Sequence, residues 1–130
     1  MAQACLDEVS TYARERVVFG QPIGKFQLVQ SKITDMVVGI ESARYLTYRL
    51  AWLKDQGVQD VRREASIAKM VATDVALMAA THAVQIFGAY GCSAEYPVSR
   101  YYRDAKVFQI VEGVNELHRV LIAEYTLGYR

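Results

Sequence analysis

The sequence feature that most constrains the fold is a long, regular series of mainly apolar residues in the first half of the chain. Its members follow one another at alternating steps of four and three residues: Val29, Ile33, Met36, Ile40, Ala43, Thr47 and Leu50. This is the packing period of helices in antiparallel bundles. The series predicts one helix from about Lys25 to about Gly57, roughly 30 residues and ~45 Å long. Since so long a helix is unusual in a globular domain, we expect it to extend past its own bundle or to pack against other subunits.

Helical spacing also organises the segments on either side. Residues 2–18 carry one apolar face, made of Leu6, Val9, Tyr12 or Ala13, and Val17. This helix ends at the sequence FGQPIG, because Gly20 permits a left-handed backbone and Pro22 cannot continue a helix. A third helix runs from an N-cap at Asp60 to about Tyr90 and is apolar nearly all round. Such a composition is typical of a buried helix.

The C-terminal part of the sequence predicts two more helices. A short one covers 98–106, and a last one runs from about Asn115 to Leu127, with an inward face made of Leu117, Val120, Leu121 and Tyr125. Together these elements predict an all-α protein, an antiparallel four-helix bundle with four main helices. The 130 residues fit a single domain, and a hydrophobic content of 52% is enough for a sizeable core.

Charge and cysteine content narrow the class of protein. The net charge is +1, from 15 basic and 14 acidic residues, which gives no reason to expect nucleic acid or an anionic membrane as a partner. Cys5 and Cys92 form neither a redox motif nor a zinc spacing, so we expect a reducing, cytoplasmic setting. No uninterrupted apolar run reaches the ~18 residues of a membrane helix, and we expect no membrane span. We also expect no metal site.

One acidic residue stands out from this background. In the stretch KVFQIVEGVNELHR (106–119), Glu112 follows an almost entirely apolar run and precedes Gly113. Apolar surroundings disfavour the charged form of a carboxylate, which suits a general base that takes a proton from carbon. Gly113 allows a ligand to approach the backbone closely. Spacing alone leaves a second interpretation open, in which Glu112 is an acid near the start of the last helix that favours the helix dipole.

Other polar residues have simpler structural interpretations. His82 lies on the buried third helix and is interpreted as a core histidine, whereas His118 is interpreted as a surface residue. The segment RREASIAK (62–69) is interpreted as a solvated first turn rather than a basic patch. The segment FGAYG (87–91) follows a helix and not a strand, so it is no dinucleotide fingerprint.

Four stretches taken together resemble a known family. They are RERVVFGQPIGKFQLVQ (14–30), QIFGAYG (85–91), EYPVSRYYRDAK (95–106) and QIVEG (109–113). In this order and spacing they resemble the C-terminal helical domain of the FAD-dependent acyl-CoA dehydrogenases, over almost the whole chain. The resemblance implies an oxidoreductase that converts an acyl thioester to its α,β-unsaturated form. In that reaction a glutamate removes the α-proton while the β-hydride passes to the flavin N5.

The resemblance assigns roles to individual residues. The glutamate of the family's EGT motif falls on Glu112, the base, and Gly113 lies beside the substrate. The residues implied to contact the FAD of a neighbouring subunit are Arg16, Phe19, Gln27, Gln85, Ile86, Phe87, Gly88 and Ala89. For Arg16 the physical basis is that a planar guanidinium pairs well with phosphate oxygens.

Three positions depart from the family pattern. Ala89 stands where the family has a second glycine, and Val114 stands where it has a threonine that contacts flavin. Glu116 replaces a glutamine and would bring negative charge near an anionic cofactor, which lowers affinity. These departures keep open a family member that acts on a carrier-protein-bound acyl group.

The resemblance also implies partners and context. An FAD shared between subunits implies a homodimer or homotetramer. The family resemblance itself implies acyl-CoA or another acyl thioester as substrate, and an electron-transfer flavoprotein or similar electron acceptor. Family members are much longer and contain an N-terminal helical domain and a middle β-domain. We therefore expect residues 1–130 to be a fragment of a three-domain enzyme, with little or no dehydrogenase activity alone. We expect a cytoplasmic protein, or one of the mitochondrial matrix in a eukaryote.

Two further interpretations stay open at this point. One is a non-catalytic helical module that assembles with itself or with a separate flavoprotein subunit. The other is a family member that works as an oxidase or oxygenase rather than a dehydrogenase, because oxygen access depends on domains outside this sequence.

Overall fold

Five α-helices form most of the molecule, which is a computed structural model describing residues 1–130. The helices are α1 (Ala2–Glu15), α2 (Gln27–Asp55), α3 (Arg62–Phe87), α4 (Val98–Phe108) and α5 (Asn115–Leu127). The remaining elements are the strands β1 (Val17–Val18) and β2 (Gln21–Pro22) and the short 3-10 helices η1 (Ile23–Lys25) and η2 (Gly88–Cys92). The predicted all-α class is confirmed.

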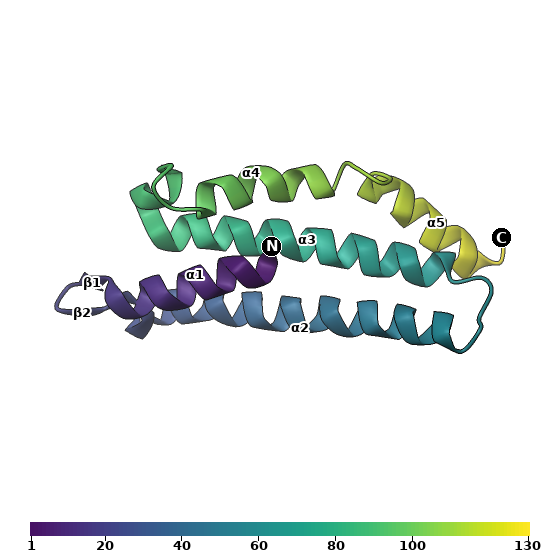
Figure 1. Cartoon of the computed structure of the whole chain (residues 1–130), viewed down its shortest axis with the longest axis horizontal. Helices are drawn as coiled ribbons and strands as arrows, with labels where there is room; N and C mark the ends of the chain where they lie inside the picture. The colour runs from purple at the N-terminus through teal and green to yellow at the C-terminus, as the bar shows by residue number, and fades with distance from the viewer.

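The helices are arranged around α3. The two long helices α2 and α3 run antiparallel, and α1 covers one half of this pair (Figure 1). On the other side of α3, α4 and α5 lie end to end, so that they form one column with a break between them (Figure 1). Each of the other four α-helices packs against α3. The third helix, which its apolar composition predicted to be a buried one, is thus the helix that the other four cover.

Small side chains allow this close packing. The most deeply buried positions in the middle of α3 are alanines: Ala76, Ala79, Ala80 and Ala83. The segment Arg62–Cys92 has the length and composition of a membrane-crossing helix, with a mean hydropathy of 1.4 in its most apolar 18-residue window and 39% of that window buried. A helix surrounded by four others in a bundle needs the same apolar composition, so length and hydropathy are weak indications of a membrane span here.

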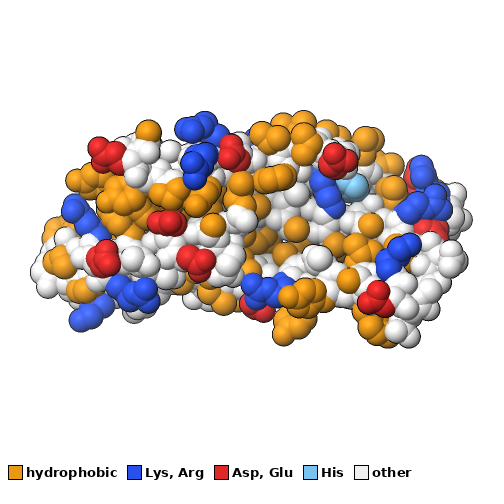
Figure 2. Space-filling view, in the orientation of Figure 1, with side chains coloured by type: hydrophobic (Ala, Val, Ile, Leu, Met, Phe, Trp, Pro, Cys, Tyr) orange, Lys and Arg blue, Asp and Glu red, His pale blue; other side chains and the backbone are white.

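The heptad series on α2 is buried only in part. Met36, Ile40 and Ala43 are buried, whereas Thr47 is exposed and Leu50 is half-buried. The reason is that α1 covers only the N-terminal part of α2 (Figure 1). In the C-terminal part Tyr45, Tyr48 and Trp52 are 68%, 61% and 58% exposed. Figure 2 shows hydrophobic side chains along this edge of the molecule. Since α2 lies beside α3 along its length, it does not extend past the bundle, and packing of its uncovered edge against other subunits stays a prediction.

A β-hairpin ends α1 earlier than predicted. The helix stops at Glu15, because Val17 and Val18 pair with Pro22 and Gln21 in an antiparallel register. The two loop residues Phe19 and Gly20 both have positive φ, 51° and 77°. Positive φ at both loop positions is what a type I′ hairpin turn requires. Asparagine or glycine is usual at the first of these positions, and a phenylalanine there is uncommon.

Two details of the predicted helices are wrong. The N-cap of α3 is Val61 rather than Asp60, although the Arg62 backbone N–H does donate to Asp60 Oδ1 at 3.2 Å. On α5, Leu117 and Val120 are 62% and 55% exposed instead of facing inward. This helix packs mainly against α3, so its contact face is narrower than its apolar spacing indicates.

Candidate functional site

The break between α4 and α5 carries Glu112. A backbone hydrogen bond from Asn115 N to Gln109 O, 3.0 Å long, closes the loop at this break. Inside the loop Glu112 has a φ of 56° and Gly113 a φ of 89°. Glu112 and Phe19 are the two non-glycine residues of the chain with a left-handed backbone. This conformation costs a non-glycine residue about 1–2 kcal/mol, and it persists only where the surrounding structure holds it.

Two side chains hold the backbone of this loop. Lys69 Nζ, from α3, donates to the carbonyl oxygen of Gly113 at 2.7 Å. His118 Nε2, from α5, lies 3.4 Å from the carbonyl oxygen of Glu112. A Cβ atom at residue 113 would lie 3.1 Å from the same His118 nitrogen. Both the positive φ and this close approach therefore favour glycine at position 113.

A buried polar network lies beneath the loop. Asn115 is only 5% exposed, and its amide nitrogen donates to Thr73 Oγ1 at 2.9 Å and to Asp74 Oδ1 at 2.8 Å. Its amide oxygen accepts a hydrogen bond from Lys69 Nζ at 2.7 Å. Gln109 also donates to Asp74 Oδ1, at 2.7 Å. No buried side-chain nitrogen or oxygen is left without a partner, so the network is fully satisfied and rigid.

The carboxylate of Glu112, in contrast, is free and exposed. It forms no hydrogen bond or ion pair within the chain. The preceding apolar residues are also exposed: Val107, Phe108, Ile110 and Val111. Figure 2 shows hydrophobic side chains gathered over the end of α4 and the following loop. The predicted apolar surroundings are therefore present, as a surface patch around an exposed acid rather than a buried pocket.

The alternative interpretation of Glu112, an acid near the start of the last helix, stays a prediction, although Glu112 lies before that helix and not in its first turn. The first helical residue of α5 is Asn115, and the acid in its first turn is Glu116. The place of Glu116 in the first turn explains why an acid can replace the family's glutamine here, because negative charge at this end of a helix favours the helix dipole. Glu116 lines a polar hollow of about 300 Å³ together with Lys106 and Arg119, so two cations share its surroundings. Val114 is the N-cap of α5, and its carbonyl accepts from Leu117 N at 2.9 Å.

Two earlier interpretations of polar residues need correction. His118 is half-buried rather than on the surface, and its Nδ1 lies 3.0 Å from Ser66 Oγ. In the segment 62–69 the two arginines are exposed, but Lys69 contacts the Glu112 loop and Ser66 contacts His118 of α5. The signal in the sequence was the helical spacing of Ser66, Lys69 and Thr73 on a helix that is otherwise apolar. His82 is half-buried, with Nε2 3.7 Å from Asp35 Oδ2.

The residues implied to bind FAD gather at the end of the molecule that holds the hairpin. Arg16 and Phe19 belong to the hairpin region, and residues 85–89 form the end of α3 and the start of η2. Two neighbouring hollows share Val18, Ile23 and Ile86. One, of about 290 Å³, is also lined by Phe19 and Gln85. The other, of about 270 Å³, is also lined by Arg16, Phe87, Gly88 and Ala89. Gln27 lines neither hollow, although both of its neighbours, Phe26 and Leu28, line the first.

Stacked aromatic rings support this end of the molecule. Tyr12 stacks on Phe87 with ring centroids 4.0 Å apart, and Tyr96 meets both rings edge-on. Burial raises the pKa of Tyr12 above its ordinary value. Tyr90 packs on Tyr96, and the guanidinium of Arg16 lies 5.8 Å from the Tyr90 ring centroid. No carboxylate of the chain pairs with Arg16, so this guanidinium remains available to an anion.

The backbone at position 89 does not require the glycine that the family has there. Gly88 has a φ of 62°, whereas Ala89 has no positive φ. A side chain is therefore tolerated at position 89, where the family has its second glycine.

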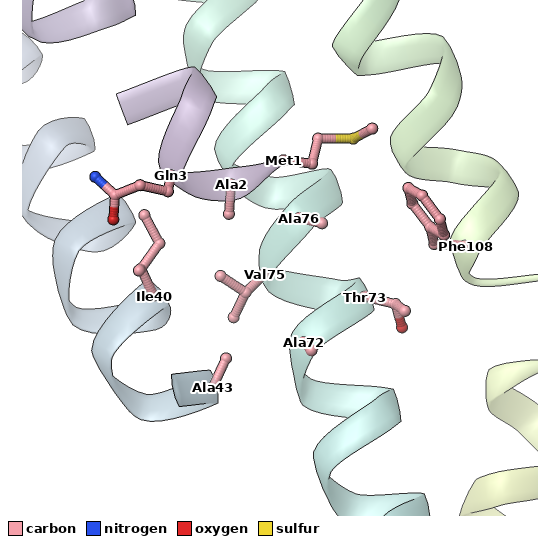
Figure 3. Close-up of a pocket in the computed structure, with 10 residues that line it drawn as sticks. All are labelled: Met1, Ala2, Gln3, Ile40, Ala43, Ala72, Thr73, Val75, Ala76 and Phe108. Carbon is pink, nitrogen blue, oxygen red and sulfur yellow. The ribbon is translucent and has the colours of Figure 1, made fainter. Parts of the chain in front are cut away.

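The largest hollow of the molecule lies elsewhere. It measures about 370 Å³ and is lined mainly by apolar residues of α1, α2 and α3, with Phe108 of α4 at one side (Figure 3). None of the site residues predicted from the sequence lines it. No group of three or more histidine, cysteine or acidic side chains is arranged to hold a metal ion, and the cysteines Cys5 and Cys92 are not paired.

Comparison with known proteins identifies the family of this all-α domain. The family model described as "Acyl-CoA dehydrogenase, C-terminal domain" matches residues 1–127. The acyl-CoA dehydrogenase of Bacillus subtilis (strain 168) is 47% identical over 128 residues, which are 98% of this chain and 34% of that protein.

Solved structures give the same result. The complex of glutaryl-coenzyme A dehydrogenase with glutaryl-CoA is 44% identical with a TM-score of 0.95, over 99% of this chain and 33% of that one. The FAD complex of PigA is 30% identical with a TM-score of 0.91, over 98% of this chain and 33% of that one. The chain therefore belongs to the acyl-CoA dehydrogenase family of flavoproteins. Within that family it corresponds to the C-terminal domain, and it spans about a third of the length of these relatives.

Proposed function

We propose that this chain is the C-terminal domain of an FAD-dependent enzyme that dehydrogenates an acyl thioester between its α- and β-carbons, with Glu112 as the base. The observation that carries the proposal is the geometry of Glu112. Its backbone is held in a left-handed conformation by neighbouring side chains, while its carboxylate stays unpaired in an exposed apolar patch. A backbone strained and fixed at one residue, with a free side chain, is a pattern found at functional sites.

The chemistry divides between the chain and the cofactor. Glu112 takes the α-proton of the thioester, and bound FAD supplies the acceptor for the hydride from the β-carbon. Loss of the proton and the hydride leaves a carbon–carbon double bond. The exposed apolar side chains beside Glu112 cover the acyl chain and exclude water, which favours proton transfer from carbon. Gly113 adds no side chain where the substrate approaches.

Arg16, Phe19, Gln27 and residues 85–89 are proposed to hold FAD. The unpaired guanidinium of Arg16 suits the diphosphate, and the rings and hollows beside it suit flat, partly apolar groups. These residues and Glu112 lie at opposite ends of α4, whose 11 residues span ~16 Å. We therefore propose that they serve different FAD molecules, one of them bound mainly by a second subunit. This arrangement requires at least a homodimer.

The substrate proposed is an acyl-CoA, because the relatives and the glutaryl-CoA complex act on or bind CoA thioesters as their names state. An electron-transfer flavoprotein is the proposed electron acceptor, as the family resemblance implies. The remaining two-thirds of the enzyme is proposed to supply the other contacts to substrate and flavin, so that residues 1–130 alone have little activity.

Two substitutions in the full-length enzyme that carries this domain test the proposal. Glu112→Gln removes the base but keeps its size, so we expect exchange of the substrate α-proton to be lost while the FAD content stays that of the parent. Arg16→Ala removes the proposed phosphate contact, so we expect FAD to be lost and activity to be restored in part by excess FAD. The measurements are deuterium exchange into the thioester and the visible absorbance of bound flavin.

The reverse pattern would overturn these assignments. If Glu112→Gln loses flavin but exchanges α-protons once flavin is restored, Glu112 is structural. If both variants bind flavin and the parent does not exchange α-protons with any acyl thioester, the domain is a non-catalytic assembly module.

A further inference from the structure

A polar stripe on α3 faces the loop that carries Glu112. Ser66, Lys69 and Thr73 follow one another at helical spacing, and each forms a hydrogen bond with a residue of the loop or of α5. Polar groups on an otherwise apolar central helix destabilise the fold unless they are paired. Apolar residues at these three positions could pack against α5 without needing hydrogen-bond partners. The position of the stripe therefore indicates that the loop above it needs hydrogen-bond donors.

The donors reach the two backbone carbonyls of the strained segment. Lys69 Nζ lies 2.7 Å from Gly113 O, and His118 Nε2 lies 3.4 Å from Glu112 O. These are the carbonyl of the left-handed glutamate and the carbonyl of the residue after it. Together they oppose the rotation of Glu112 back to an ordinary backbone conformation, which would swing its carboxylate away.

Both donors are themselves oriented by partners. Lys69 Nζ has a second acceptor, the Asn115 amide oxygen, at 2.7 Å, and Asn115 is buried and bonded to Thr73 and Asp74. His118 Nδ1 lies 3.0 Å from Ser66 Oγ. When Nε2 carries the proton and donates to Glu112 O, Nδ1 accepts from the Ser66 hydroxyl. Each donor thus has two partners: Lys69, from α3, contacts Gly113 and Asn115, and His118, from α5, contacts Glu112 and Ser66.

We infer that Lys69 and His118 are positioning residues for the reaction, which clamp the backbone of Glu112 so that its carboxylate is aimed at the substrate α-carbon. The inference rests on the proposed role of Glu112 as the base. It assigns a function in turnover to two side chains that touch neither the substrate nor the reacting atoms. Their effect is expected on the chemical step and not on cofactor binding.

The test uses four single variants of the full-length holoenzyme. Lys69→Met keeps the length of the side chain and removes its donor, and Lys54→Met, on the exposed end of α2, is its matched control. His118→Leu removes the second donor, and His118→Gln restores a side-chain N–H that can reach the same carbonyl. We expect Lys69→Met to lower kcat about 100-fold, with KM and FAD content near those of the parent, since small misplacements of a catalytic group have effects of this size. We expect Lys54→Met to match the parent, and His118→Gln to retain most of the activity that His118→Leu loses.

A double variant separates positioning from a general structural effect. If Lys69 acts through Glu112, adding Lys69→Met to Glu112→Gln lowers the residual activity no further. A kcat like that of the parent in folded Lys69→Met, or the same fold-loss in the Glu112→Gln background, would overturn the inference. Should Lys69→Met fail to fold, the two His118 variants decide, and equal activities of these two would overturn it. If Glu112→Gln keeps full proton exchange, the proposed function fails instead, whatever Lys69 does.

Discussion

At the scale of single residues, Glu112 brings stability and function into conflict. Its left-handed backbone is unfavourable for any residue with a Cβ atom but not for glycine. An enzyme that kept glycine at this position would be easier to fold and would lack the proposed base. A strained residue of this kind is the expected result when an active side chain is needed at one fixed point.

This conflict predicts a measurable order of stabilities. Glu112→Ala and Glu112→Gly both remove the carboxylate, but only the glycine variant relieves the backbone. We expect Glu112→Gly to be more stable than Glu112→Ala by about 1 kcal/mol, as measured by urea unfolding of the chain. The same pair of substitutions at Glu116, which lies on helical backbone, should give the opposite order, because glycine destabilises a helix. Equal stabilities of the two Glu112 variants would show that the backbone at this residue is not strained.

Sequence reasoning found the exposed members of the site and missed the residues beneath them. Glu112 stood out because an acid after an apolar run is visible in the sequence itself. Lys69 and His118 were assigned to the surface, because helical periodicity does not reveal that a loop more than forty residues away packs on one turn of α3. The contacts that hold a strained residue come from tertiary structure, and one sequence does not contain them in readable form.

At the scale of secondary-structure elements, a second polar cluster joins the end of the C-terminal helix α5 to the start of α3. Asp60, just before α3, accepts hydrogen bonds from Arg62 Nε and Nη2 at 2.9 and 2.8 Å and from the Tyr125 hydroxyl of α5 at 2.9 Å. The hydrogen bonds from Arg62 hold the pKa of Asp60 well below its ordinary value near 3.8. The ionised carboxylate is thus the form that joins the start of α3 to the end of α5.

This cluster predicts that acid loosens α5. A carboxyl whose pKa is lowered in the folded state contributes stability above its unfolded pKa and loses that contribution as pH falls. We therefore expect the free energy of unfolding, measured in urea, to fall as pH drops below about 4, where Asp60 in the unfolded chain becomes protonated while the folded carboxyl stays ionised. Asp60→Asn should remove most of this pH dependence, whereas Tyr129→Phe, on the exposed C-terminal end, should leave it unchanged. Identical titrations of the parent and Asp60→Asn would contradict this role.

The helices themselves were easier to predict than their ends. The apolar spacing of α2 and the apolar composition of α3 were strong enough to place both helices to within a few residues. The hairpin at 17–22 was missed because strands of two residues are too short to show alternation, and its turn contains Phe19 where asparagine is usual. The inward face of α5 was misassigned because periodicity identifies an apolar face but not how many neighbours cover it.

At the scale of the whole molecule, much apolar surface remains uncovered. Exposed hydrophobic side chains lie along the C-terminal half of α2 and around the α4–α5 break: Tyr45, Tyr48, Trp52, Val107, Phe108, Ile110 and Val111. Monomeric proteins rarely expose patches of this kind. We predict that the chain self-associates through the α2 patch at micromolar concentrations.

The only tryptophan, Trp52, reports on this association. We expect its emission to shift to shorter wavelength as concentration rises, in step with the mass measured by sedimentation. Tyr45→Lys with Tyr48→Lys should give a smaller species, because two charges would be buried in the contact. Tyr129→Lys, at a residue that is 76% exposed, should change neither property. A monomer with concentration-independent emission would contradict the prediction.

The central helix α3 sets the distance and the angle between the two proposed sites. Lys69, near one end of α3, holds the loop of the proposed base, while Gln85 to Phe87, at the other end, line the proposed cofactor hollows. Inserting or deleting one residue between them would turn the two ends relative to each other by about 100° and shift them by about 1.5 Å. The length of this segment should therefore be invariant among homologues, whereas the exposed connection 56–59, before Asp60, is free to gain or lose residues.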